Sequence, residues 1–240
     1  MRWKYIKNKK GVYRKILGYG TVSYSHREED ILINNMLKYA FYVSGKINYL
    51  DIGAGEPILY SNTYYFYKRG GNGVCVDPRK HIQQQFEKKR RNDIFLPVAI
   101  SVKTETKNFY EFDLGLISTL NDNDKNIYEN NGYKIKSTYS VQTIDINQIL
   151  SKYFENKELH LLDIDIEGNE FEVIKQLDFT KFQPYVICIE VVDPLTDLHR
   201  ENTLELVEYM KTKDYHIFVD TISNLIFFNQ NKLKNKYYMK

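Results

Sequence analysis

Short apolar runs alternate with amphipathic segments along most of the chain. Such runs, when they carry few polar residues, are typical of strands buried on both faces. They lie at residues 47–52, 73–77, 94–101, 159–166 and 185–192. The intervening segments space their apolar residues as helices do, and the sequence predicts helices over residues 61–69, 81–91, 169–177 and 201–213.

The order of these elements predicts an α/β fold. Strands that alternate with helices form a mostly parallel sheet with helices on both faces. A further strand is predicted at 106–112, and a short strand runs into a helix over 141–150. Only a tight turn separates the last two strands, 215–220 and 221–228, so one of them must run antiparallel.

The two ends of the chain and one internal segment depart from this alternation. The chain starts with an irregular basic segment, and Ser25 with Glu28 then fits a capping box, which predicts a helix within residues 23–45. We therefore divide the chain into an N-terminal part (1–45), a central domain (46–230) and a tail (231–240). The polar segment 121–134 has no apolar period and is predicted to be a mobile surface loop.

Composition narrows the class of protein. The chain has 240 residues, of which 42% are hydrophobic, enough for a packed core. The net charge of +3 provides no basic face for duplex DNA. Cys75 and Cys188 lie inside apolar runs, which indicates buried thiols in a reducing compartment. No apolar run is long enough to span a membrane and no signal peptide is visible, so we expect a cytoplasmic protein.

A glycine turn follows the first apolar strand. Gly53 and Gly55 lie where ligands bind in parallel sheets, and Asp77 ends the next strand, where an acid accepts hydrogen bonds from ribose hydroxyls. A dinucleotide site requires a third glycine, but Ile58 stands there and the next helix starts late. Asp51 precedes the turn and suits a positively charged amino acid group, which S-adenosylmethionine has and NAD lacks.

Carboxylates gather at the end of the central strand. Asp165 and Glu167 follow that strand, Asp163 shares a face with Asp165, and Glu190 ends the neighbouring strand. Asp165 or Glu167 is our candidate for orienting a methyl acceptor or removing its proton. The alternative is that Glu167 caps the helix at 169–177 and Asp165 braces backbone amides. Several carboxylates can also hold Mg²⁺, an alternative that we do not favour, and we predict no metal ligand.

Two histidines are further candidates for the base. His26 lies at the start of the first helix, in a segment that can fold over a ligand. His199 lies in the loop after the strand that ends at Glu190, where acceptor-binding loops belong. Either histidine can act as the base or have an ordinary surface role.

Several of these segments together resemble the FkbM-type S-adenosylmethionine-dependent methyltransferases. They are SYSHREEDILIN, YLDIGAGEP, LYSNTYYFYKRG, GVCVDP, LLDIDIEGNEFEVIKQLDF and PYVICIE, and the resemblance extends over residues 23–228. The opening segment is similar to that of the branch that starts S-Y-S-Q-x-x-E-D. Two positions depart from the pattern: His26 replaces a glutamine, which puts the substrate-side contact in doubt, and Gly55 replaces an asparagine.

The resemblance implies a Rossmann-like class I methyltransferase, with a seven-stranded, mostly parallel sheet, an antiparallel last strand and an N-terminal helical extension that packs over the cofactor site. It implies O-methylation of a sugar, glycan precursor or other small metabolite, as in polysaccharide biosynthesis, with S-adenosyl-L-methionine as cofactor. The cofactor-binding residues that we predict are Tyr24, Ser25, Asp51, Gly53, Ala54, Gly55, Asn62, Asp77, Pro78, Val98 and Ala99, with Val98 and Ala99 at the adenine. The catalytic candidates are Asp165, Glu167 and His199.

Two rival functions stay open. A nicotinamide-dependent oxidoreductase is disfavoured by the missing third glycine and by the lack of a suitably placed Tyr-x-x-x-Lys pair. A non-catalytic or RNA-binding protein on the same scaffold is the other alternative, because a fold does not determine a function. The sequence does not decide the oligomeric state.

Overall fold

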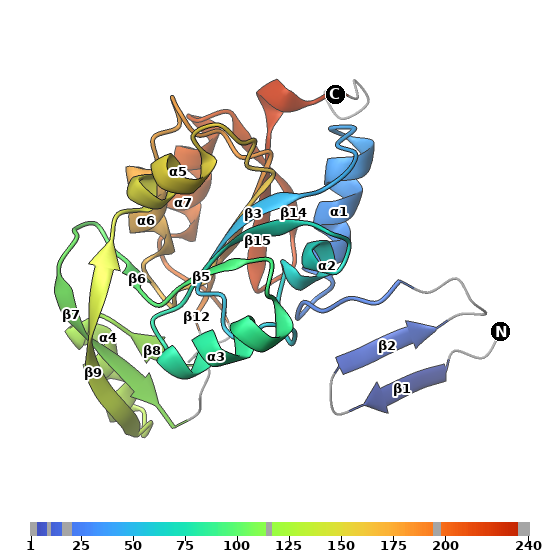
Figure 1. Ribbon diagram of the computed structural model, residues 1–240. Coiled ribbons are helices and arrows are strands. Elements are labelled where there is room, and N and C mark those ends of the chain that lie inside the picture. Colours follow the sequence, from blue (N-terminus) through green and yellow to red (C-terminus); the bar gives the residue numbers. More distant parts are fainter. Residues whose placement is uncertain (1–3, 9–10, 16–20, 114–116, 194–197, 235–240) are drawn as a thin grey trace.

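The computed structural model describes residues 4–8, 11–15, 21–113, 117–193 and 198–234, and a seven-stranded sheet forms its centre (Figure 1). The strand order is β14-β15-β11-β10-β3-β4-β5. In that order the strands are Tyr215–Asp220, Asn224–Asn229, Val186–Glu190, Leu161–Ile164, Asn48–Ile52, Asn72–Val76 and Ile94–Leu96. The predicted sheet is therefore confirmed.

The direction of the last strand also agrees with the prediction. β11, β10, β3, β4 and β5 pair in parallel, whereas β15 pairs antiparallel with both β11 and β14. β14 and β15 are joined by a hairpin that leaves no room for a crossover helix, so β15 must run against its neighbours. This is the mostly parallel, Rossmann-like arrangement of class I methyltransferases.

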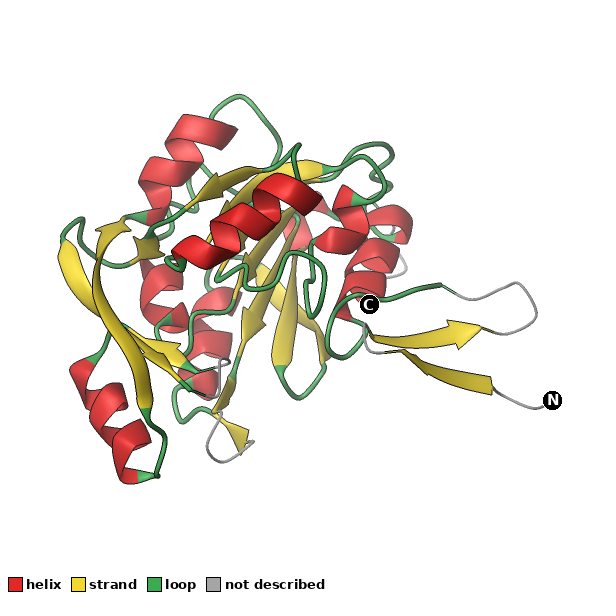
Figure 2. Ribbon diagram, turned by 60° about the horizontal axis from the view of Figure 1, so that its bottom comes forward, coloured by secondary structure: helices red, strands yellow, loops and turns green. Residues whose placement is uncertain are grey.

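Helices cover both faces of this sheet (Figures 1 and 2). One face packs against α5 (Ile146–Phe154), α6 (Glu170–Gln176) and α7 (Thr203–Lys211). The other face packs against α1 (Glu29–Tyr39), α2 (Tyr64–Tyr67) and α3 (Lys80–Lys89). The predicted helix at 61–69 is shorter than expected, although Ser61 Oγ does accept a hydrogen bond from the Tyr64 backbone N–H at 3.1 Å.

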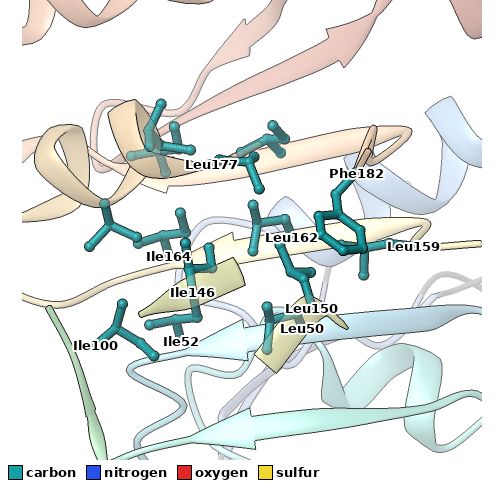
Figure 3. Close-up of a cluster of buried hydrophobic side chains, with 14 of the residues drawn as sticks. Leu50, Ile52, Ile100, Ile146, Leu150, Leu159, Leu162, Ile164, Leu177 and Phe182 are labelled. Atoms are coloured by element: carbon teal, nitrogen blue, oxygen red, sulfur yellow. The ribbon is translucent and has the colours of Figure 1, made fainter. Parts of the chain in front are cut away.

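Alternation along the strands divides the core into two clusters. Leu50 and Ile52 of β3 point into the first cluster, whereas Tyr49, between them and the strand start, points into the second. Figure 3 shows the first cluster, in which Leu50, Ile52, Leu162 and Ile164 meet the side chains of α5. The same alternation turns Asp51 toward the face that carries α3.

A second sheet was not predicted. β6 (Ala99–Ile100), β9 (Ile135–Ile144), β7 (Thr106–Phe112) and β8 (Ser118–Thr119) form a four-stranded sheet beside the main one. The apolar run at 94–101 splits at Pro97, so β5 and β6 belong to different sheets. The strand predicted at 106–112 is confirmed as β7.

The prediction of a mobile loop at 121–134 was wrong. Residues Asp122–Asn130 form α4, which Asn121 caps by accepting a hydrogen bond from the Asn123 N–H at 2.8 Å. One residue of α4, Tyr128, packs edge-on against Phe112 of β7 with ring centroids 5.4 Å apart. A single buried aromatic residue holds this helix, so the segment shows no helical apolar period.

The N-terminal part differs from the prediction in two respects. Its basic start contains an antiparallel hairpin of β1 (Lys4–Asn8) and β2 (Gly11–Lys15), drawn at the N-terminal end in Figure 1. The capping box does not form, because Glu28 lies in the left-handed region (φ 67°) and no side chain caps α1. Instead Asp30 accepts hydrogen bonds from Ser23 Oγ at 2.7 Å and from the Tyr24 N–H at 2.7 Å, which folds residues 23–28 back over the helix.

Three short elements complete the described chain. β12 (Val192–Asp193) pairs antiparallel with β13 (Leu198–His199), and a 3-10 turn lies at Gln230–Lys232. Leu233, in the predicted tail, is buried in the second cluster, and residues 235–240 lie outside the described part. No described helix has the length and apolar character needed to cross a membrane.

A buried arginine joins α3 to the main sheet. Arg90 is 0% exposed and its Nε lies 2.7 Å from Asp93 Oδ2. Its Nη1 donates to Ser61 Oγ at 3.1 Å and its Nη2 to Thr63 Oγ1 at 2.9 Å and to the Tyr49 hydroxyl at 3.2 Å. Since every one of these acceptors is also buried or half-buried, the guanidinium replaces its lost hydration with protein contacts.

We expect Arg90→Met to destabilise the fold strongly. Methionine keeps much of the apolar stem but leaves the carboxylates of Asp51 and Asp93 buried without their cation, which typically costs about 3–5 kcal/mol. Arg91→Met is the matched control, because Arg91 is exposed and its replacement should change stability by less than about 0.5 kcal/mol. Urea unfolding of the three proteins measures the difference, and equal midpoints for the two variants would contradict the role of Arg90.

Candidate active site

One pocket collects the carboxyl ends of the central strands. It has a volume of about 680 Å³ and is lined by Gly53, Asp77, Asp165 and Glu190, which follow or end β3, β4, β10 and β11. The second sheet forms its opposite wall with Phe109, Glu111 and Lys136. The volume lies in the range of about 300–1,000 Å³ that is typical of small-molecule sites.

The glycine turn forms the floor of this pocket. The Gly53 and Ala54 N–H groups donate to the Val76 carbonyl oxygen at 2.8 and 3.1 Å, so the turn is tied to the end of β4. Gly53 (φ +80°) and Gly55 (φ +53°) both adopt left-handed conformations. A Cβ on Gly53 would lie 1.6 Å from the Asp165 carbonyl oxygen, so only glycine lets β3 and β10 end side by side.

Asp77 faces the pocket beside this turn. Its Oδ2 accepts a hydrogen bond from the Gly55 N–H at 3.1 Å, which links the acid to the glycine turn. Its two carboxylate oxygens also accept hydrogen bonds from the Arg79 guanidinium, at 2.9 Å from Nε and 2.6 Å from Nη2. A ligand that uses Asp77 must therefore share this carboxylate with Arg79.

The structure places most of the predicted cofactor-binding residues on the pocket wall. Those that line it are Gly53, Ala54, Gly55, Asn62, Asp77, Pro78, Val98 and Ala99. Tyr24, Ser25 and Asp51 do not line it. Tyr24 accepts a hydrogen bond from Lys68 Nζ at 2.7 Å and Ser25 Oγ donates to Asp30 at 3.1 Å, so both belong to the N-terminal segment's own contacts.

Asp51 lies one layer beneath the pocket. It accepts a hydrogen bond from Thr63 Oγ1, and Arg90 Nη1 lies 3.9 Å from its Oδ2. Burial raises the pKa of Asp51 to about 6, against the opposing effects of Arg90 and of the Thr63 hydrogen bond. Its contacts are those of a carboxylate that supports the glycine turn from below.

Three carboxylates line the inner end of the pocket, and Arg200 and Glu170 lie against them without lining it. Oxygen atoms of Asp165, Glu167 and Glu190 all lie within 4.8 Å of one another. Arg200 lies 3.1 Å from Glu190, 3.1 Å from Glu170 and 3.7 Å from Glu167. One guanidinium thus forms ion pairs with three carboxylates, and the cluster contains more carboxylates than cations.

This crowding raises the pKa values of the cluster. Burial and then the charge of Asp165 raise the pKa of Glu167 well above its ordinary value, and the same two causes act on Glu190. Partial removal from water and then Glu170 raise the pKa of Asp165 to about 6. Because Asp165 is open to the pocket, water moderates the first effect at that residue.

A strained turn presents Glu167 to the pocket. Glu167 has φ 57° and Gly168 has φ 120°, both in the left-handed region, which is unusual for a residue with a side chain. The alternative that Glu167 caps the following helix was wrong. No side-chain hydrogen bond caps α6, and Glu170 instead braces the preceding turn by accepting hydrogen bonds from the Ile166 N–H at 3.1 Å and the Gly168 N–H at 3.0 Å.

The FkbM family is identified by the comparisons with known proteins. The pattern described as "Methyltransferase FkbM domain" matches residues 51–217, more than half of the chain. The chain belongs to the FkbM methyltransferase family. The comparison with curated proteins finds no match. The enzyme is thus a methyltransferase, as the resemblance of its motifs implied.

Two solved structures are similar in shape to this FkbM methyltransferase. The fibrillarin/Nop5p complex has 15% identity and a TM-score of 0.46, over 85% of this chain and 79% of that one. "Crystal structure of a putative O-methyltransferase from Klebsiella pneumoniae" has 10% identity and a TM-score of 0.43, over 86% of this chain and 81% of that one.

The two histidine candidates of the FkbM methyltransferase have different outcomes. His26 lines the pocket, where its ring meets Tyr60 edge-on with centroids 5.4 Å apart. The backbone of His199 pairs with Val192, but its side chain lies outside the described residues. A catalytic role for either stays a prediction.

Sequence reasoning missed several residues that line the pocket of the enzyme or contact its lining. Arg79 follows the predicted Asp77 by two positions, so its proximity was readable from the chain. Arg200 lies ten positions after Glu190 in an irregular segment, where no pattern marks it. Glu111 and Lys136 reach the pocket from the second sheet, which the sequence did not predict as a unit.

The glycine turn leads to a prediction about stability. Gly55→Ala should cost about 1 kcal/mol, because alanine resists the left-handed conformation but meets nothing closer than 3.7 Å. Gly53→Ala should cost about 4 kcal/mol or more, because its Cβ also collides with the Asp165 backbone. Chemical unfolding measures both variants, and similar losses would show that β10 can move away from the turn.

The acid cluster leads to a second prediction. The pKa of Glu167 is higher in the folded protein than in the unfolded chain, where a glutamate has a pKa of about 4.3. The folded state therefore loses stability as the pH rises from that unfolded pKa through the folded one. Glu167→Gln removes that loss and should raise the melting temperature by about 2–4 °C at about pH 8, and by less at about pH 4.5.

Glu155→Gln, at an exposed site, provides the control and should leave the melting temperature unchanged at both pH values. All measurements are made with a chelator present. A lower melting temperature of Glu167→Gln at about pH 8 would mean that the pair with Arg200 outweighs the repulsion.

Proposed function

We propose that this FkbM enzyme transfers the methyl group of S-adenosylmethionine to a hydroxyl oxygen of a sugar, glycan precursor or other small metabolite. One observation carries the proposal: the glycine turn with Asp77 and the carboxylates Asp165 and Glu167 border the same pocket. A cofactor floor and a set of proton acceptors thus lie side by side on one pocket.

The residues at the glycine turn fit the cofactor. Gly53 leaves the backbone bare where a ligand must approach closely, and Asp77 offers carboxylate oxygens to the ribose hydroxyls in place of the Arg79 guanidinium. α2 does not begin until Tyr64, so no helix start points at the turn as a pyrophosphate would need. This supports S-adenosylmethionine over a nicotinamide dinucleotide. Bound there, the sulfonium supplies an activated methyl group.

The acid cluster supplies the groups that the acceptor needs. A hydroxyl must be aligned for in-line displacement and must lose its proton during transfer. Asp165 is open to the pocket, and its raised pKa of about 6 leaves it ionised at neutral pH while making it a stronger proton acceptor than an ordinary aspartate. Arg200 contacts Glu167 and Glu190 of the cluster without lining the pocket. His26 and His199 are the alternatives for the base.

The cluster also offers oxygen ligands that a divalent cation such as Mg²⁺ prefers. Arg200 already contributes a positive charge to Glu167 and Glu190, which supports a reaction without metal. Cys75 and Cys188 are buried free thiols, which supports a location in the reducing cytoplasm.

Two variants separate cofactor binding from chemistry. Asp77→Ala should weaken binding of S-adenosylhomocysteine in calorimetry by about 2 kcal/mol or more, through loss of the ribose hydrogen bonds. Asp165→Asn should keep that affinity near the wild-type value and lower turnover by roughly 10²-fold or more. Each variant is the control for the other.

Turnover is followed by mass spectrometry with S-adenosylmethionine and metabolites of the producing cell. Unchanged affinity in Asp77→Ala would remove Asp77 from the cofactor site. Full activity of Asp165→Asn would move the base to Glu167 or to a histidine. Loss of wild-type activity with a chelator, restored by Mg²⁺, would show that a metal takes part.

A further inference from the structure

An exposed tyrosine stands at the rim of the pocket in a strained backbone conformation. Tyr60 lines the pocket, is 59% exposed and has φ 59°. The left-handed region costs conformational free energy for any residue with a side chain, and a side chain this exposed regains little of that free energy by burial. Core packing therefore does not explain why a large aromatic ring is held here.

The ring is supported by a neighbouring histidine. His26 meets it edge-on at 84°, with centroids 5.4 Å apart, and also lines the pocket. Next to His26, Arg27 Nε donates to Ser223 Oγ at 2.9 Å, which ties this segment to the β14–β15 hairpin. The pair of rings is thus held between two parts of the chain that are far apart in sequence.

The inner wall of the same pocket offers hydrogen-bond acceptors in excess. Asp165, Glu167 and Glu190 present carboxylates there, with Asn169 and Asn224 beside them. Glu167 Oε2 is buried and lies 3.7 Å from Arg200 Nη2, but it has no hydrogen-bond partner within the part of the chain that the structure describes. Buried acceptors of this kind call for an occupant with several donor groups.

We infer that the Tyr60 ring, supported edge-on by His26, is a stacking platform for the apolar face of a neutral pyranose ring, whose hydroxyl groups donate to the carboxylates of the inner wall. A pyranose combines a face of C–H groups with an edge of O–H donors, and the pocket has the complementary two sides. A purely apolar ring would offer these carboxylates no donors, and a phosphate group placed against the inner wall would meet like charge. That this ring is the methyl acceptor rests on the proposed function.

The test uses two glycine variants of tyrosines with the same backbone strain. Tyr42 has φ 55°, is 57% exposed and does not line the pocket, so Tyr42→Gly is the control for Tyr60→Gly. Glycine adopts this conformation without strain, so both variants should melt no earlier than wild type. Any difference in ligand binding then comes from the ring and not from the fold.

The probes are the methyl β-pyranosides of glucose, galactose and fucose, followed by saturation-transfer NMR with and without S-adenosylhomocysteine. At least one should bind wild type and Tyr42→Gly alike, with the strongest transfer to the ring hydrogens of one face. Tyr60→Gly should bind it about 3- to 10-fold more weakly, the range expected for one aromatic stacking contact.

Equal affinity of Tyr60→Gly and wild type, or no binding of any of the three pyranosides to wild type, overturns the platform. Calorimetry with S-adenosylhomocysteine decides the proposed function separately. If that ligand fails to bind while the Tyr60-dependent pyranoside binding persists, the platform stands and the methyl-transfer proposal falls. If S-adenosylhomocysteine binds but no pyranoside does, the methyl-transfer proposal stands and the platform falls.

Discussion

The arrangement of the site depends on the contacts of one buried group, the guanidinium of Arg90. Arg90 joins the end of α3 to Tyr49 on β3, to Asp93 before β5, and to Ser61 and Thr63 at the start of α2. Thr63 in turn donates to Asp51, directly before the glycine turn. A planar group with five donors can satisfy acceptors from several elements at once, which a lysine cannot do. Arg90 therefore helps to position the glycine turn, the floor of the pocket, although Arg90 itself does not line the pocket.

Whereas the contacts of Arg90 are attractive, those within the acid cluster of the pocket are mainly repulsive. Asp165, Glu167 and Glu190 repel one another, Glu167 sits in a strained turn, and Arg200 balances only part of their charge. Such an arrangement reduces stability at neutral pH, but it also yields carboxylates that accept protons readily. Strain and like charge gathered at one place are what a protein tolerates where it carries out chemistry.

Long-range pairing explains most of what the sequence did not reveal. β9 pairs with both β6 and β7, and α4 covers this sheet through Tyr128 and its neighbours. A polar helix held by one aromatic ring has no apolar period to read, so residues 121–134 were predicted as a loop. The N-cap of α1 shows the same limit: Ser25 had the spacing of a capping box, but its hydroxyl bonds to Asp30 instead.

The sequence by itself determined the main sheet, its helices and the place of the glycine turn, because those features are local: apolar period, turn residues and the carboxylates that follow each strand. Asp77, Asp165 and Glu167 were found in this way, and the motifs around them identified the family. Only the tertiary structure placed Arg200 among three carboxylates and Tyr60 against His26. These contacts join residues whose spacing carries no regular signal, and side-chain charge and packing decide them after the strands have been brought together.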